Sequence, residues 1–161
     1  MKKETLKIDL EKLQKAHWSS EEIANVKLVV GFVQKLMNDH EFDTVLKEYG
    51  NASYIQHNRN IPDGIEGLVE VLKGFTKQFP DYCYDVKQII ADGDHVIFHS
   101  HATMKEGDRG DDKKGLNITD NWKIRDGEIV EHWDSLQALD GFMRFYALLN
   151  GGKIRNFNGV F

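Results

Sequence analysis

Apolar residues recur at the spacing of one helix face in three stretches of the first half of the chain. These predicted helices span residues 20–40, 41–49 and 64–79. The motif Ser19-Ser20-Glu21-Glu22 is typical of a helix start, because serine caps free amides and acids suit the positive end of the helix dipole. Gly50 and Pro80 end the second and third helices. Leu6, Leu10 and Leu13 also have helical spacing, which predicts a short helix near the N-terminus.

The second half of the chain alternates apolar and polar residues, as half-buried strands do. The predicted strands span residues 82–91, 95–105, 116–125 and 128–137, after a short strand at 53–57. Tight turns at 92–94 and 126–127 join neighbouring strands, so the sheet must be antiparallel. Residues 106–115 are polar and form a hairpin tip, and residues 139–149 form a last helix. This order predicts an α+β fold.

The composition fits one soluble domain over residues 1–161. Residues 1–18 form an N-terminal extension, and residues 139–161 form the C-terminal helix and tail. The net charge of -5 disfavours nucleic acid and anionic membranes as partners. The single cysteine, Cys83, excludes an intrachain disulfide. We see no export signal, membrane span or glycine-rich phosphate loop, and we expect a cytoplasmic protein without a dinucleotide cofactor.

Ionisable and apolar side chains share faces of the last two strands. Asp120 and Trp122 lie on one face of the third strand, and His132 and Asp134 lie on one face of the fourth. Such a mixture is typical of a small-molecule pocket. Burial raises the pKa of a carboxyl and an imidazolium lowers it, so Asp134 is a candidate general acid/base. The alternative is a structural ion pair or a capping carboxylate near the strand end.

Two further polar groups are candidates for substrate binding. His99 and His101 project to one side of their strand and could bind a metal together with Asp120 or Asp134. They could equally be hydrogen-bonded to one another or exposed at a dimer face. The segment Gln56-His57-Asn58 ends a short strand, where it lines a pocket mouth or satisfies the turn. Trp133 alternates away from Asp134 and is expected on the opposite, convex face of the sheet.

Several segments together resemble the SnoaL-like polyketide cyclase family, within the nuclear transport factor 2-like superfamily. The similarity is closest to the bacterial SnoaL-like aldol-condensation group and covers about residues 20–138. The matching segments are Tyr54-Ile55-Gln56-His57-Asn58, Pro62-Asp63-Gly64, Asp92-Gly93-Asp94, His99-Ser100-His101 and the run from Asp126 to Asp134.

The resemblance implies a cone of N-terminal helices packed on a strongly curved antiparallel sheet. It also implies a homodimer through the sheet and a pocket without cofactor. In that family, an aspartate at the position of Asp134 is the acid/base of an aldol closure. A polar residue at the position of Asp120 lies beside it, and the strand end near Gln56 lines the pocket.

The leading hypothesis is therefore a cofactor-free cyclase, aldol-type lyase or isomerase acting on a small carbonyl compound. Asp134, His132 and Asp120 are the expected catalytic residues. Gln56, His57, His99, His101 and Trp122 are the expected substrate-binding residues. The alternative is a non-catalytic module of the same fold that binds a small ligand or a protein partner.

Overall fold

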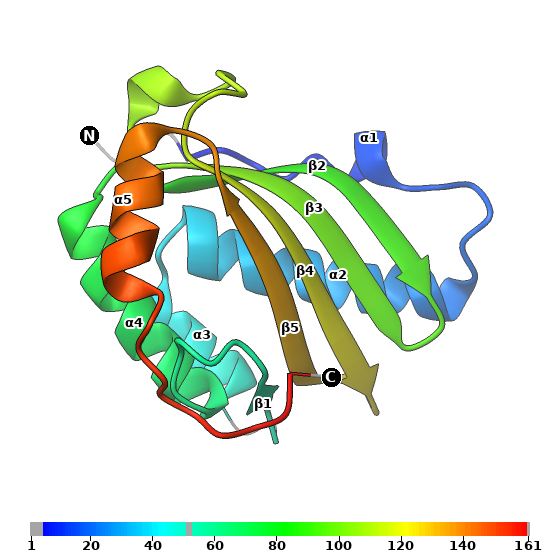
Figure 1. The fold of residues 1–161 in the computed structure, drawn as a ribbon. Helices are drawn as coiled ribbons and strands as arrows, with labels where there is room; N and C mark the ends of the chain where they lie inside the picture. The colour runs from blue at the N-terminus through cyan, green and yellow to red at the C-terminus, as the bar shows by residue number, and fades with distance from the viewer. Residues whose placement is uncertain (1–4, 51–52, 161) are drawn as a thin grey trace.

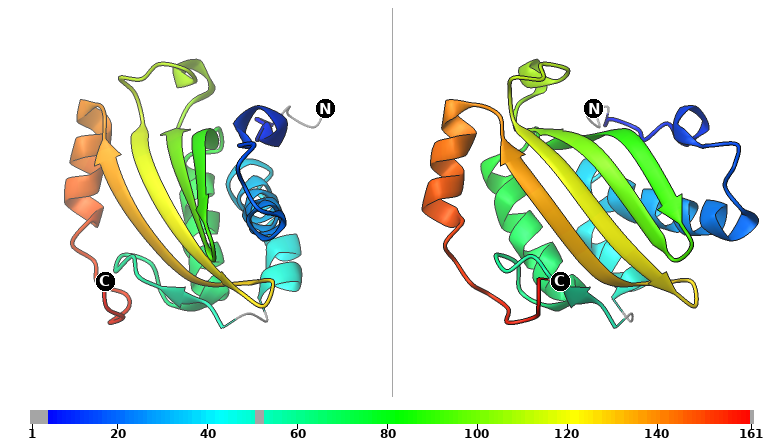
Figure 2. Two further views of the ribbon diagram at one scale, coloured as in Figure 1. Left: turned by 90° about the vertical axis from the view of Figure 1, so that its right-hand side faces the viewer. Right: turned by 45° about the vertical axis from the view of Figure 1, so that its right-hand side comes forward.

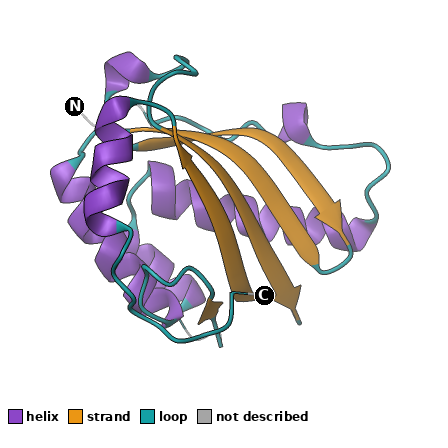
Figure 3. Cartoon of the chain, viewed as in Figure 1, coloured by secondary structure: helices purple, strands orange, loops and turns teal. Residues whose placement is uncertain are grey.

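The computed structural model describes residues 5–50 and 53–160, so residues 1–4 of the predicted N-terminal extension lie outside it. The described part is an α+β fold in which the helices gather on one side of a curved, open sheet (Figures 1 and 3). The helices are α1 Leu10–Leu13, α2 Ser20–Val33, α3 Phe42–Tyr49, α4 Gly64–Gln78 and α5 Gly141–Asn150. The strands are β1 Ile55–Gln56, β2 Cys83–Asp92, β3 His95–Thr103, β4 Leu116–Arg125 and β5 Glu128–Ala138. The predicted fold class is confirmed.

Helix α2 begins where the sequence predicts. The Ser19 hydroxyl accepts a hydrogen bond from the Glu22 amide at 3.2 Å, and the Glu22 carboxylate accepts one from the Ser19 amide at 2.7 Å. This capping box satisfies amides that an isolated helix would leave free. The helix continues beyond Val33 as a π-helical turn, Gln34–Asn38, which the spacing of apolar residues did not reveal.

The sheet has the strand order β1-β5-β4-β3-β2. Strands β2 to β5 form the predicted antiparallel meander, and both Asp126 and Gly127 have positive φ, as a two-residue hairpin turn of type I′ requires. The short β1 instead pairs parallel with β5, which aligns Gln56 with His132. That parallel pairing is a long-range contact that no turn signal predicts, and it completes the candidate site.

The two faces of the sheet differ in what covers them. Helix α2 packs against β2 and β3, and in the right-hand view of Figure 2 the helices α2, α3 and α4 lie behind the sheet. On β3, Val96 and Phe98 are fully buried on this inner face, whereas His99 and His101 lie on the outer one. These histidines share the outer face with the β4 residues directly opposite them, because directly opposed residues of neighbouring strands point to the same side of the sheet.

The last strand ends, and the last helix begins, slightly later than the sequence predicts. Strand β5 continues through Ala138, and helix α5 starts at Gly141, where the Asp140 carboxylate accepts a hydrogen bond from the Met143 amide at 2.9 Å. The tail then runs from α5 along the loop that follows β1 (Figure 1). The polar hairpin tip contains a short 3-10 helix, Glu106–Asp108. Among the described helices, none has the length and apolar character to cross a membrane.

Candidate active site

A cavity of about 360 Å³ lies between α4, the inner face of the sheet and α5. This volume falls within the range of roughly 300–1,000 Å³ that is usual for small-molecule sites. Its walls are mainly apolar, with Leu68, Leu72, Phe75, Ile118, Leu136 and Met143 among them. Asp120, His132 and Asp134 also line it, so one part of the cavity carries ionisable groups.

A second hollow, of about 510 Å³, lies by the N-terminal segment and includes Lys7, Asp39 and Arg109. Asp39 there accepts hydrogen bonds from Thr5 at 2.6 Å and from Lys7 at 2.8 Å. These contacts hold the N-terminal segment on the body of the protein. We therefore place the candidate chemistry in the smaller cavity, which contains the buried His and Asp groups.

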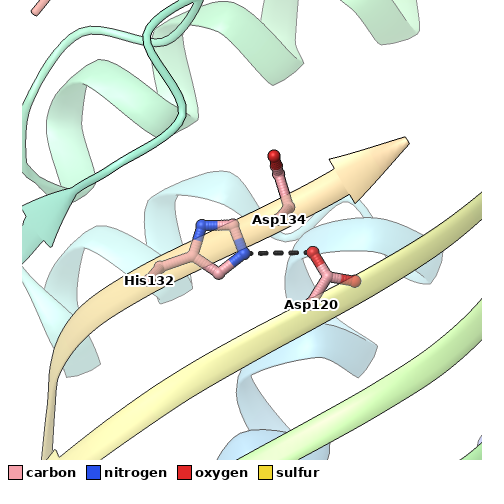
Figure 4. Close-up of side chains that lie close together, drawn as sticks. All are labelled: Asp120, His132 and Asp134. Carbon is pink, nitrogen blue, oxygen red and sulfur yellow. Dashed lines mark hydrogen bonds and ion pairs between the residues drawn. The ribbon is translucent and has the colours of Figure 1, made fainter. Parts of the chain in front are cut away.

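Strand register brings the three ionisable residues together. Asp120 of β4 is directly opposite Asp134 of β5, and His132 is two residues before Asp134 on the same face. One ligand atom from each of the three lies within 4.8 Å of those from the other two. Figure 4 shows His132 Nε2 directed at the Asp120 carboxylate, at 3.0 Å from Oδ1. The fold thus brings these three side chains together in one cavity.

The imidazole of His132 is fixed at both nitrogens. Its Nδ1 lies 3.1 Å from Gln56 Oε1, an oxygen that also accepts a hydrogen bond from the Asn58 amide at 2.9 Å. Because Oε1 is an acceptor, Nδ1 carries a proton, and Nε2 faces the carboxylate of Asp120. This arrangement suits an imidazolium that donates both protons.

The electrostatic surroundings of His132 agree with that assignment. Burial lowers the pKa of His132, but the hydrogen bond to Asp120 and the charges of Asp134 and Asp120 raise it, and the net direction is upward. The ring also stacks on Trp122, with ring centroids 5.2 Å apart. His132 and Asp120 thus form a buried ion pair with little exposure to solvent.

Asp134 has a different environment. Burial raises its pKa and the charge of Asp120 raises it further, whereas His132 and the hydrogen bond from Asn58 lower it, with a net increase. The Asn58 Nδ2 group lies 2.7 and 2.8 Å from the two carboxylate oxygens. Within the described part of the chain, Asp134 is therefore the carboxylate of the cavity without a direct ion pair, and a raised pKa suits a group that both accepts and returns a proton.

Tyrosines complete the polar part of the cavity. The Tyr84 hydroxyl donates a hydrogen bond to Asp120 Oδ2, which leaves Asp120 with partners on both oxygens. Burial, followed by the charge of Asp120, raises the pKa values of Tyr82 and Tyr84, so both stay protonated donors. Sequence analysis missed both tyrosines as site residues. Their spacing of two within the predicted strand 82–91 was a usable signal, although β2 itself begins only at Cys83 and their proximity to Asp120 depends on the tertiary fold.

The structure does not bring every predicted substrate-binding residue to the cavity. Gln56 is fully buried behind His132, and Trp122 lies beneath the same ring, so both support the site from outside the cavity lining. The ring of His57 lies on the opposite face of the sheet, stacked on Trp133 at 4.4 Å between centroids, with Nε2 3.2 Å from Glu131.

The metal site considered for His99 and His101 is ruled out by the fold. His99 lies opposite Thr119, and its Nε2 lies 2.7 Å from Asn117 Oδ1. His101 lies opposite Asn117, and its Nε2 lies 2.7 Å from the Lys114 carbonyl oxygen. Asp120 and Asp134 are on the other face, so the proposed ligand set cannot assemble. Asp120, His132 and Asp134 have a spacing that could hold a cation, but one would have to replace the 3.0 Å contact between His132 and Asp120.

Comparison with protein families matches residues 27–143 to the family described as SnoaL-like polyketide cyclase. The chain belongs to this family. The match covers more than half of the chain and includes the whole sheet and the Asp120, His132 and Asp134 cluster. No curated protein matches the chain.

Several solved structures share the fold. A candidate polyketide cyclase from Bacillus cereus has 20% identity and a TM-score of 0.62, covering 80% of this chain and 83% of its own. A candidate SnoaL-like polyketide cyclase from Jannaschia has 16% identity and a TM-score of 0.61, covering 89% and 100%. AclR, a candidate hydroxylase from Streptomyces galilaeus, has 19% identity and a TM-score of 0.59, covering 81% and 97%. These similarities confirm the cone-shaped, nuclear transport factor 2-like fold.

Proposed function

We propose that this SnoaL-like protein is a cyclase-type enzyme that uses Asp134 as a general acid/base on a small carbonyl compound. The observation that carries the proposal is the difference between the two carboxylates of the cavity. Asp120 is committed to His132 and Tyr84, whereas among the described residues Asp134 has a hydrogen bond from the Asn58 side-chain amide alone, and its pKa is raised. One carboxylate is thus free to exchange a proton with a ligand.

The proposed reaction begins with ionised Asp134 taking a proton from the carbon next to a substrate carbonyl. The electron pair of the broken C–H bond forms an enolate, whose carbon then attacks a second carbonyl of the same molecule. Protonated Asp134 returns its proton to the alkoxide that results. A well-placed general base contributes roughly 10²–10⁴ in rate, so positioning and stabilisation of the enolate must supply the rest.

Tyr82 is the group best suited to stabilise the enolate oxygen. Its hydroxyl belongs to a buried residue that lines the cavity, and it remains protonated because its pKa is raised. Among the described residues its hydroxyl has one hydrogen bond, a long contact of 3.8 Å to Met37 Sδ. A donor with so weak a partner can turn to a substrate oxygen without losing a strong interaction.

His132 and Asp120 have supporting roles in this proposal. Both imidazole protons of His132 are used, on Gln56 and on Asp120. His132 therefore acts as a fixed positive charge next to Asp134, which keeps a useful fraction of Asp134 ionised despite burial. Asp120 holds that charge in place, and we propose it as a positioning residue.

Exchange of substrate protons with solvent tests the proposal without knowledge of the natural substrate. Aryl ketones such as β-tetralone would be incubated with the protein in deuterium oxide, and loss of the α-proton signal followed by NMR. We expect Asp134→Asn to lower the enzymatic exchange rate by about 10²-fold or more. Asp126→Asn, an equally conservative change in the distant β4–β5 turn, is the control. If Asp134→Asn exchanged the α-protons as fast as the wild type, Asp134 would not be the general base.

The second candidate is a non-catalytic binding module. The mainly apolar cavity wall supports a binding module as well as it supports an enzyme. It predicts tight binding of an apolar ligand with no proton exchange in any ketone tested.

We also propose a homodimer through the outer face of the sheet, supported by the absence of α2, α3 and α4 from that face (Figure 2). Multi-angle light scattering of wild type and of Ile97→Glu, a change on that face, would test it.

A further inference from the structure

The C-terminal tail is fixed against the loop that follows β1. The Arg155 amide donates to the Arg59 carbonyl oxygen at 2.7 Å. Asn156, a buried residue, donates from its side chain to the carbonyl oxygens of Asn58 at 2.9 Å and Ile61 at 2.8 Å. From the loop side, the Asn60 amide group donates to the Lys153 carbonyl oxygen at 2.8 Å. These contacts set the path of the tail, which Figure 1 shows beside the loop.

This path brings two basic residues to the cavity. Lys153 and Arg155 both line it, and apart from His132 they are the basic residues among its lining. Both are exposed, so they lie at the mouth and not in the interior. Neither the ammonium group of Lys153 nor the guanidinium group of Arg155 makes an interaction with a described residue. Two cations at the rim of the cavity are thus available to a ligand.

The loop that follows β1 supports both the cationic pair, Lys153 and Arg155, and the proposed acid/base, Asp134. Asn58 holds the carboxylate of Asp134, and Asn60, two residues later, holds the Lys153 backbone. The apolar walls of the same cavity come from α4, β4 and α5. One cavity thus combines two exposed cations, apolar walls and a proton-transfer group.

We propose that Lys153 and Arg155 form an anion subsite, and that the ligand of this cavity joins a carboxylate to an apolar body. The inference rests on the proposed function only in assigning a carbonyl group of that ligand to the neighbourhood of Asp134. Arginine binds carboxylates through two parallel hydrogen bonds, and lysine adds a point charge. The anionic group stays at the wetted mouth, where it keeps part of its hydration, while the apolar body is buried.

Two fluorescent probes that differ mainly in charge test the subsite. Anilinonaphthalene sulfonate carries one anionic group on an apolar body, and N-phenylnaphthylamine is its neutral counterpart. Both would be titrated into wild type and into the double variant Lys153→Gln/Arg155→Gln. We expect the Kd of the sulfonate to rise about fivefold to twentyfold in the double variant, and the Kd of the neutral probe to change less than about twofold.

Control variants make the result specific. Lys27→Gln/Lys47→Gln removes the same charge from exposed sites on α2 and α3, and should leave both Kd values unchanged. Ala147→Trp narrows the cavity from α5 and should weaken both probes, which locates them in the cavity. High salt should reduce the advantage of the wild type, because screening shortens the reach of exposed charges from about 8 Å to about 3 Å between 0.15 M and 1 M.

The subsite would be overturned if wild type and Lys153→Gln/Arg155→Gln bound the sulfonate with equal Kd. It would also be overturned if Ala147→Trp left the binding of both probes unchanged, because they would then bind outside the cavity. The outcome is independent of catalysis. Asp134→Asn should keep, or strengthen, the preference of the cavity for the sulfonate, because it removes a negative charge. Loss of proton exchange in that variant with retained charge discrimination would separate the acid/base from the anion subsite.

Discussion

His132 Nε2 lies 3.0 Å from Asp120 Oδ1, and this buried pair determines how the neighbouring Asp134 can behave. With His132 charged and both its protons committed, Asp134 faces a fixed cation that it does not have to contact directly. One carboxylate neutralises the imidazolium, and the other remains available for proton transfer.

The coupling between Asp120 and His132 can be measured with a double-mutant cycle. Asp120→Leu leaves a buried imidazolium without its counter-ion, and we expect a loss of about 3–5 kcal/mol in the free energy of unfolding. His132→Leu should show a loss of similar sign. The double variant should be more stable than the sum of the single changes by about 0.5–3 kcal/mol. Urea denaturation measures all four proteins, and strict additivity would contradict the ion pair.

Removing the charge of Asp134 should stabilise the protein at neutral pH. Burial raises the pKa of Asp134 in the folded state above its unfolded value. Stability is therefore fully present below the unfolded pKa and is lost as pH rises through the folded pKa, at about 1.4 kcal/mol per unit of difference. Asp134→Asn has no carboxyl group at this position, so it does not lose stability in this way. Its advantage over wild type should grow as the pH rises from the unfolded pKa of Asp134 through the folded one and then level off, as thermal unfolding measured over a pH series would show.

The Asn58 side chain should set the pH at which Asp134 becomes active. Its hydrogen bond to both carboxylate oxygens lowers the pKa of Asp134. Asn58→Ala removes this effect, so the acidic limb of the pH–rate profile for ketone exchange should move to higher pH. Asn60→Ala, which acts on the tail and not on Asp134, is the matched control. A limb that stays in place would mean that another group is the base.

Tyr82→Phe should reduce proton exchange without disturbing ligand binding. The variant retains the ring in the cavity and removes the proposed donor to the enolate oxygen. We expect kcat to fall by about 10²-fold with little change in KM. Tyr146→Phe removes another cavity hydroxyl, whose described contact is to Gln78 at 3.5 Å, and should have little effect on kcat. Equal effects of the two changes would remove Tyr82 from the mechanism.

Part of the site followed from local patterns in the sequence. Alternation placed His132 and Asp134 on one face of β5 and Trp133 on the other, and that separation holds in the structure. The motif Ser19-Ser20-Glu21-Glu22 predicted the start of α2, where the structure has a capping box whose hydrogen bonds join residues three apart. Signals of this kind depend only on nearby residues, and the geometry of a single strand or helix fixes them.

The tertiary structure decided which faces meet. The parallel pairing of β1 with β5 placed Gln56 behind His132 and turned His57 toward Trp133. The separate pairing of β3 with β4 left His99 and His101 on the face away from the cavity. Residues 58 to 60 hold the tail by contacts that span more than 90 positions. Period-two alternation sorts side chains within a strand but cannot tell which face the helices will cover. Burial against distant segments makes that choice, and it separated Asp134 from the histidines of β3.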